Sequence, residues 1–272
     1  MNLYRDIGIA ARAWVFAVRG IGRETTLEPF LLIGLAQAIL LAGLVWFYLP
    51  ALAQILEPVV RGIGGEEATH YPHHLWTLPE TWRTTNLILL LTVTVIMRAV
   101  ATARYANAPA IWSAAFGRAP ALILIAIAGP GVAWGITTAF NQIPTEISLS
   151  SFVIRIGLQG LELGMIVIVE SLVGYAIAFV MLDGAGPLRA IGASVGLALR
   201  HPLPTLLILA VPAVILFPPT FFLVEMDVAQ SGLSPEGVAL AWTLRLIVEW
   251  ALLILVTGGL TGIYLHHPRR AQ

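Results

Sequence analysis

The sequence predicts an all-α, polytopic integral membrane protein with six transmembrane helices. Its residues are 58% hydrophobic and only 11% charged, with a mean hydropathy of +0.87. A soluble domain carries roughly a quarter charged residues, so this composition indicates a chain surrounded by lipid. A helix needs about 20 apolar residues to cross the hydrocarbon core. Six runs meet or approach this length: residues 30–49, 86–106, 119–140, 161–182, 203–224 and 239–265.

The composition also excludes several classes of function. The chain has no cysteine, which excludes disulfides, thiol catalysis and cysteine-ligated metals. Its formal net charge is zero, so no basic field points to nucleic acid. No Walker or HExxH pattern occurs, and no set of acid, base and nucleophile stands out. We therefore expect no cofactor and no catalytic residue, and an enzyme is the least favoured class.

The first segment, residues 3–19, has the pattern of an amphipathic helix. Arg5, Arg12 and Arg19 recur every seven residues and form one stripe along a helix. Apolar residues such as Trp14 fall on roughly the opposite side. This arrangement predicts a helix in the membrane interface, with its arginines toward anionic headgroups. The lipid bilayer is therefore the expected partner of this surface.

The longest polar stretch, residues 51–85, separates the first two spans. It contains His70, His73 and His74 close to two glutamates, and imidazole with carboxylate suits zinc and similar ions. Pro72 prevents a regular helical pair of histidines, and no familiar ligand spacing matches. These histidines are weak candidates, and we expect a solvated connector without a metal.

Prolines interrupt two of the spans. The third span contains Pro130 between two glycines, and the fifth contains Pro212, Pro218 and Pro219. Each could be a packed kink whose freed backbone groups are satisfied by neighbours. Each could equally be a broken helix that exposes backbone to a binding site. The sequence leaves both alternatives open.

The distribution of arginine predicts the orientation in the membrane. Six spans place both termini on one side, and the segments on that side are much richer in arginine than the opposite connectors. Because cytoplasmic loops carry the excess of basic residues, we expect both termini in the cytoplasm of a bacterial inner membrane. The terminal side holds Arg5, Arg12, Arg19, Arg23, Arg104, Arg118, Arg189, Arg200, Arg269 and Arg270; the opposite side holds Arg61, Arg83 and Arg155.

An internal repeat is predicted within this single membrane domain of residues 1–272. Arg118-Ala-Pro120 is followed after nine residues by Pro130, and Arg200-His-Pro202 is followed after nine residues by Pro212. The alternative is that arginine and proline are ordinary before a helix, since proline is tolerated in the first turn. In the repeat, a short interfacial helix, an outgoing span and a return span would occur three times, in residues 3–106, 107–182 and 187–265.

This alternation of short amphipathic segments ending in Arg-x-Pro with apolar spans resembles bacterial polytopic membrane families. One example is the membrane domain often fused to glycerophosphodiester phosphodiesterases. The resemblance covers the organisation of most of the chain. It implies a polytopic helical fold, and it transfers no functional residue.

Each return span contains a charged residue: Arg98, Glu170 or Glu249. A charge in hydrocarbon is costly and by default marks a functional site. By helical rise, Arg98 lies about 3 Å inward of the centre of its span and Glu170 at the centre, so we expect these two to pair. The alternative for Arg98 is snorkelling to the inner interface. Glu249 lies about 6 Å outward and is expected to pair locally with Arg245.

These patterns favour a transport-related membrane component. It would be either a small permease or the membrane subunit of a larger transporter, with other membrane subunits or an ATPase as partners. The alternative is a non-catalytic scaffold or assembly subunit that packs against partner membrane proteins through faces of small residues. Those faces would contain Gly164, Gly174, Gly258, Gly259 and Gly262.

Overall fold

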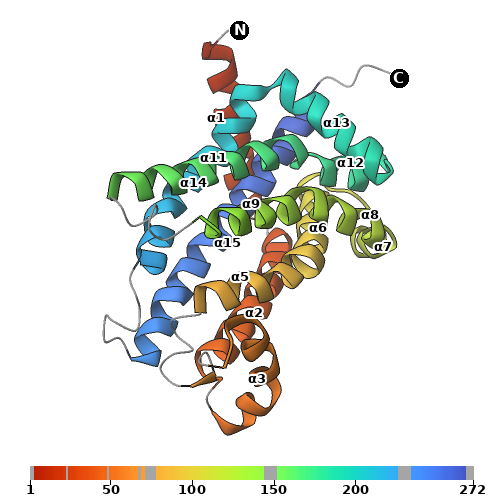
Figure 1. Cartoon of the computed structure of the whole chain (residues 1–272). Coiled ribbons are helices and arrows are strands. Elements are labelled where there is room, and N and C mark those ends of the chain that lie inside the picture. Colours follow the sequence, from red (N-terminus) through yellow and green to blue (C-terminus); the bar gives the residue numbers. More distant parts are fainter. Residues whose placement is uncertain are drawn as a thin grey trace.

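The computed structural model describes residues 3–22, 24–47, 49–66, 69–70, 78–143, 152–225 and 234–267. Within these ranges all regular elements are helices (Figure 1). In chain order they are α1 (Leu3–Ile21), α2 (Glu24–Val45), α3 (Pro50–Gly64), α5 (Leu78–Leu89), η2 (Leu90–Thr94), α6 (Val95–Tyr105), α7 (Ile111–Gly117), α8 (Ala119–Ala126), η3 (Ile127–Gly131), α9 (Val132–Asn141), α11 (Phe152–Val173), α12 (Ala176–Asp183), α13 (Pro187–Arg200), α14 (Pro202–Glu225) and α15 (Pro235–His266).

Five helical stretches are long and apolar enough to cross a membrane: Thr25–Val45, Thr81–Tyr105, Ala119–Asn141, Ile156–Asp183 and Gly237–His266. A sixth is counted if α13 and the first part of α14 form one span, although they meet at a bend of 98°. The bend lies at His201, because a residue before proline is disfavoured in the helical conformation. The all-helical fold with five to six candidate spans is therefore confirmed.

The segment between the first two spans is more helical than we predicted. Residues 51–85 were expected to form a polar connector, yet α3 and the start of α5 occupy much of this stretch. Pro50 begins α3, in agreement with the preference of proline for the first helical position. Val60 of α3 is buried in a cluster with Trp82 of α5. The stretch is polar on average, but the apolar contacts of α3 stabilise a helix within it.

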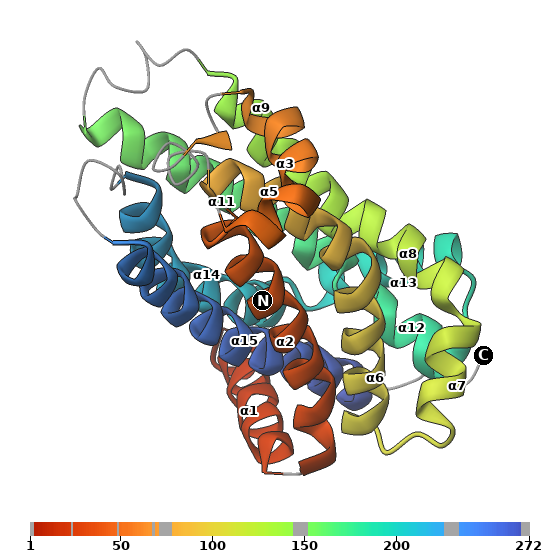
Figure 2. The same ribbon diagram turned by 90° about the horizontal axis from the view of Figure 1, so that it is seen from below.

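Three candidate spans, those that contain α6, α12 and α15, form the centre of the bundle. The helix α6 contacts both α12 and α15, and α12 continues α11 after a short break. Three other helices pack around them: α2 contacts α6 and α15, α8 contacts α6 and α12, and α14 contacts α11 and α15. Figures 1 and 2 show α15 running along the length of the molecule beside α1 and α2. The candidate functional site lies where these three spans meet.

The N-terminal helix α1 packs lengthwise on α15. A Cβ atom placed on Gly258 of α15 would lie 2.8 Å from Cα of Ala17, so the two backbones are in direct contact. The sequence predicted the exposed stripe formed by Arg5, Arg12 and Arg19, but it did not predict this docking. The buried face of α1 consists of Asp6, Ala10, Ala13, Ala17 and Gly20.

Tyr105, at the end of α6, packs between α1 and α15. Its ring fills the space between Gly20 of α1 and Gly258 of α15, and a Cβ atom on either glycine would overlap it. The phenol oxygen lies 3.4 Å from the carbonyl oxygens of Ala17 and Ile254. Glycine is therefore required here for close approach.

Candidate functional site

Two charged side chains meet in the interior of the bundle. Arg98 lies on α6 and Glu170 on α11, and Nη1 of Arg98 is 3.9 Å from Oε2 of Glu170. The two side chains are only 10% and 20% exposed. The proximity that we expected from their depths is therefore present. Snorkelling of Arg98 predicted an exposed guanidinium, and the structure does not show one.

One π-helical turn, η2, precedes Arg98 in the chain, and a second, η3, contacts the helix that carries Glu170. The turn η2 ends at Thr94, one helical turn before Arg98. The turn η3 contains Pro130, which has no N–H to donate to the preceding turn, and the N–H of Val132 donates to the carbonyl oxygens of Gly129 and Ile127. A Cβ atom on Gly129 of η3 would lie 3.5 Å from Oε1 of Glu170. The carboxylate therefore faces η3, which in turn contacts η2.

A third irregularity follows Glu170 on its own chain segment. The helix α11 ends at Val173, and α12 begins at Ala176. Ser194 of α13 accepts a hydrogen bond from the N–H of Tyr175 (3.1 Å) and donates one to the carbonyl oxygen of Leu172 (2.7 Å). A fully buried hydroxyl group from a neighbouring helix therefore forms hydrogen bonds to the backbone on both sides of the break.

Ser194 also lies in a segment, residues 192–196, that reads Gly-Ala-Ser-Val-Gly and matches the GxSxG pattern of serine hydrolases. In those enzymes the serine occupies a sharp turn between a strand and a helix. Here the segment lies inside α13, and both hydrogen bonds of the hydroxyl go to the backbone of the helix break. The match is therefore structural in this chain and does not indicate a nucleophile.

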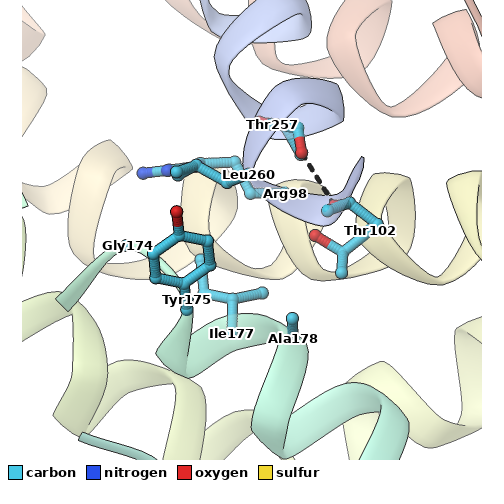
Figure 3. Close-up of a pocket in the computed structure, with 9 residues that line it drawn as sticks. Arg98, Thr102, Gly174, Tyr175, Ile177, Ala178, Thr257 and Leu260 are labelled. Atoms are coloured by element: carbon cyan, nitrogen blue, oxygen red, sulfur yellow. Dashed lines mark hydrogen bonds between the residues drawn. The ribbon is translucent and has the colours of Figure 1, made fainter. Parts of the chain in front are cut away.

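A small cavity adjoins Arg98, and residues of α6, of α12 with the break before it, and of α15 line it. Arg98 and Thr102 come from α6, Gly174 and Tyr175 from the break before α12, and Thr257 from α15. Figure 3 shows the Arg98 side chain extending over Tyr175, with its guanidinium directed away from Thr102. The cavity measures about 10 Å³, which is room for about one water molecule.

The walls of this cavity carry buried polar atoms without a hydrogen-bond partner among the described residues. These atoms are Nε of Arg98 and Oγ1 of Thr257, and Oγ1 of Thr94 lies one turn before Arg98. Thr261 donates to the carbonyl oxygen of Thr257 (2.7 Å, the dashed line in Figure 3). All three unpartnered groups are able to donate a hydrogen bond. The two threonine hydroxyls can also accept one, whereas Nε of Arg98 can only donate.

The other predicted intramembrane charges form a separate, local pair. Nε of Arg245 lies 2.8 Å from Oε1 of Glu249, one turn along α15. The guanidinium also lies over the ring of Trp242, 4.8 Å from its centroid. This is the local pairing that we expected, and neither residue lines the cavity.

The remaining candidates lie away from the pair. Pro212, Pro218 and Pro219 lie inside α14, which is continuous as a helix, so in this part of the chain the bend occurs at His201. His70 is exposed, and His73 and His74 lie outside the described residues. Within the described ranges no three histidine, aspartate or glutamate side chains are grouped so as to hold a metal ion.

A histidine pair, which the sequence did not reveal, links the bend at His201 to the end of α15. Nε2 of His201 lies 3.1 Å from Nδ1 of His267, and Arg200 and Asp6 are close by. Burial lowers the pKa of His201, and its neighbours His267, Arg5 and Arg200 lower it further, against Asp6. Burial and Arg200 also lower the pKa of His267. Both rings therefore favour the neutral form in the folded protein.

This pair predicts that stability falls in weak acid. In the unfolded chain the histidines titrate at the ordinary pKa of 6.5, above their folded values. The contact thus contributes fully above this pH, and its contribution is lost as the pH falls through the lowered folded values. The melting temperature should decline below that pH in the wild type and decline less in His267→Asn. The exposed His70→Gln is the control, and an equal decline in all three proteins would contradict the prediction.

No family model, no curated protein and no solved structure matches this chain. The functional argument therefore rests on the arrangement of its own residues, above all on Arg98, Glu170 and the cavity beside them.

Proposed function

We propose that this protein is a transport-related membrane component, either a small permease or the membrane subunit of a larger transporter. The observation that carries the proposal is the Arg98–Glu170 pair inside the bundle, beside a cavity lined by three helices. Ionisable residues in hydrocarbon face partners or cavities and mark ion and substrate pathways. Discontinuous helices form the binding sites of many transporters, and π-turns are frequent at functional sites.

The threefold repeat and the interfacial helices are part of this proposal. The short helices α1, α7 and α13 are each followed by an outgoing helix and a return helix. The residues that line the cavity lie in the last third of each of three helical stretches, α5 to α6, α11 to α12, and α15. Three repeated units arranged around one centre would contribute equivalent positions in this way. Exposed arginines on α1 and α13 lie beside exposed apolar side chains such as Val18 and Leu188. That combination suits a helix at a lipid surface.

The absence of cysteine from the chain allows a direct test, because any introduced thiol is the only one present. Thr102→Cys and Thr257→Cys would be treated with a charged, membrane-impermeant thiol reagent in right-side-out and inside-out vesicles. If the cavity opens alternately to the two sides, each position reacts from both. Ala101→Cys, which is fully buried outside the cavity, is the packed control and should not react.

The same assay tests the orientation. We expect Tyr4→Cys to react only from the cytoplasmic side and Arg61→Cys only from the outside. Both side chains are exposed, so these two variants also calibrate the vesicles. Reaction of Thr102→Cys and Thr257→Cys from neither side, or from one side only, would overturn the transport proposal.

A scaffold or assembly subunit is the second candidate function. Its support is an exposed face of α11 formed by Gly157, Gly160 and Gly164, around which no neighbouring atoms lie within 4 Å of an added Cβ. The other glycines expected to contact partners instead pack inside the bundle, which weakens this alternative. Gly174 packs against Leu260, Gly258 against Tyr105 and Ala17, Gly259 against Ile208, and Gly262 against Phe16.

A further inference from the structure

Two exposed arginines from separate helices lie near the bend between α13 and α14. Arg200 is the last residue of α13, and Arg5 lies in the first turn of α1, where its side chain is 69% exposed. Both guanidinium groups are close enough to His201, at the bend, for their positive charge to lower the pKa of its ring. The bend therefore gathers positive charge from two helices at one place.

One acidic side chain belongs to the same cluster. Oδ1 of Asp6 lies 3.6 Å from Nε of Arg5, and Asp6 is buried on the packed face of α1. Burial lowers the pKa of both His201 and His267, so the two rings add no charge when they are neutral. Arg5, Arg200 and Asp6 together then carry one net positive charge, which a ligand with one negative charge would neutralise.

The two histidines orient Arg200. A guanidinium group can only donate hydrogen bonds, so Nε2 of His267, 3.4 Å from Nη1 of Arg200, must accept one. The proton of a neutral His267 ring then lies on Nδ1, which is 3.1 Å from Nε2 of His201 and donates to it. The contact with His267 uses one of the five N–H groups of Arg200, and the planar guanidinium with its further donors suits the oxygens of a phosphate group.

The position of the bend in the fold corresponds to the depth of lipid headgroups. The helices α13 and α14 meet at 98°, so an α14 that crosses the membrane places α13 along the membrane surface and the bend at the interface. Figure 1 shows the start of α1, α13 and the end of α15 at the same end of the molecule. The apolar helix α15 ends there at His266.

Exposed apolar side chains adjoin the same cluster. Leu199, directly before Arg200, is 68% exposed. The helix α14 also has an exposed apolar face that begins about one turn beyond the bend, at helical spacing. This face consists of Leu206, Val211, Val214 and Ile215. A molecule that carries both an anionic headgroup and apolar chains therefore fits this surface better than a soluble anion does.

We propose that Arg5 and Arg200 bind the phosphate group of one anionic phospholipid, whose acyl chains lie along the exposed apolar face of α14. This site is separate from the Arg98–Glu170 pair and does not depend on the proposed transport function. A lipid with one negative charge, such as phosphatidylglycerol, neutralises the cluster. Phosphatidylcholine also contains a phosphate group but carries no net charge, so it does not.

The test is thermal unfolding of the purified full-length protein in detergent, with increasing mole fractions of phosphatidylglycerol or of phosphatidylcholine with the same acyl chains. A ligand that binds the folded protein raises the melting temperature, and the dependence on its concentration gives the affinity. We expect phosphatidylglycerol to bind the wild type more tightly than phosphatidylcholine. Each shift is measured against the same variant without lipid, so a change in intrinsic stability does not affect the comparison.

Two variants test the roles of the arginines. An arginine near an anionic lipid surface contributes about fivefold to the affinity, so Arg5→Gln and Arg200→Gln should each weaken the binding of phosphatidylglycerol by about that factor. The double variant should weaken it about 25-fold if the two contributions are independent. The affinity for phosphatidylcholine should stay unchanged in all three variants.

Arg189→Gln is the matched control. Arg189 is also exposed on α13, three turns before Arg200, so this change removes the same charge from the same helix away from the bend. An equal loss in Arg189→Gln and Arg200→Gln would indicate a general attraction to the surface and overturn the site. Equal affinities of the wild type for the two lipids would also overturn it.

Inorganic phosphate distinguishes a lipid from a soluble anion. Exchanged for chloride at constant ionic strength in lipid-free detergent, it should leave the melting temperature of the wild type unchanged. A rise that is lost in Arg5→Gln and Arg200→Gln would assign these arginines to a soluble anion and overturn the lipid site.

Discussion

Glu170→Leu and Arg98→Leu are each expected to lower the free energy of unfolding by about 3–5 kcal/mol, because each leaves a buried charge without its partner. Glu170→Leu should cost more. This change leaves the guanidinium of Arg98 without its partner. The guanidinium is the less exposed of the two groups, and it cannot lose its proton in a protein. Arg98→Leu strands a carboxyl group, which can become neutral by taking up a proton.

The double variant should recover much of this loss, because apolar side chains of similar volume replace both charges. The coupling energy in this double-mutant cycle is the quantity to measure, by reversible unfolding in mixed detergent. The cycle of Arg245→Leu and Glu249→Leu is the matched comparison on a single helix, because its side chains are 15% and 24% exposed and thus similarly buried. Strict additivity of Arg98→Leu and Glu170→Leu would contradict the pairing.

Gly258→Ala is expected to destabilise the protein by about 1–3 kcal/mol or more, the usual cost of overpacking. The new Cβ atom would lie 2.7 Å from Cζ of Tyr105 and 2.8 Å from Cα of Ala17. A backbone atom cannot relieve the overlap by a side-chain rotation, so the whole helix α1 must move away from α15. Gly20→Ala should also destabilise, but its Cβ atom meets only the Tyr105 ring among the nearest atoms.

This difference provides a test by thermal unfolding. Tyr105→Ala removes the ring and should abolish the additional cost of Gly20→Ala, whereas Gly258→Ala should remain costly in the same background because Ala17 is still in place. Gly164→Ala is the control. No atom lies within 4 Å of its Cβ position, and alanine is the better helix former by up to about 1 kcal/mol. Equal effects of the three glycine changes would disprove close packing at Tyr105.

The membrane-crossing runs were predictable because hydropathy and length alone define them. The approach of Arg98 and Glu170 was predictable because the sequence predicts both charges on spans that run in the same direction, so their expected depths can be compared. The function of the pair stays a prediction. The threonines beside it could have been noticed, since Thr94, Arg98 and Thr102 recur every four residues along one helix face.

Other features depend on contacts between distant segments, which no local pattern encodes. Ser194 holds the helix break at Tyr175 from a different helix, and η2 forms without proline or glycine in its sequence. The buried bridge from Trp250 through Gln37 to Asn86 joins three helices by side-chain hydrogen bonds of 2.6 and 3.1 Å. Single amides and indoles in apolar runs gave no indication that they meet.

The docking of α1 on α15 has a consequence for biogenesis. The helix α1 leaves the ribosome long before its packing partner α15 has been made. At about 5–20 residues per second, the interval between the end of α1 and the start of α15 is roughly 10 to 40 seconds. During that time the small-residue face of α1 has no α15 to cover it. The docking of α1 can therefore follow only after α15 has been made, and a chain truncated before Gly258 should insert its earlier helices and leave α1 undocked from α15.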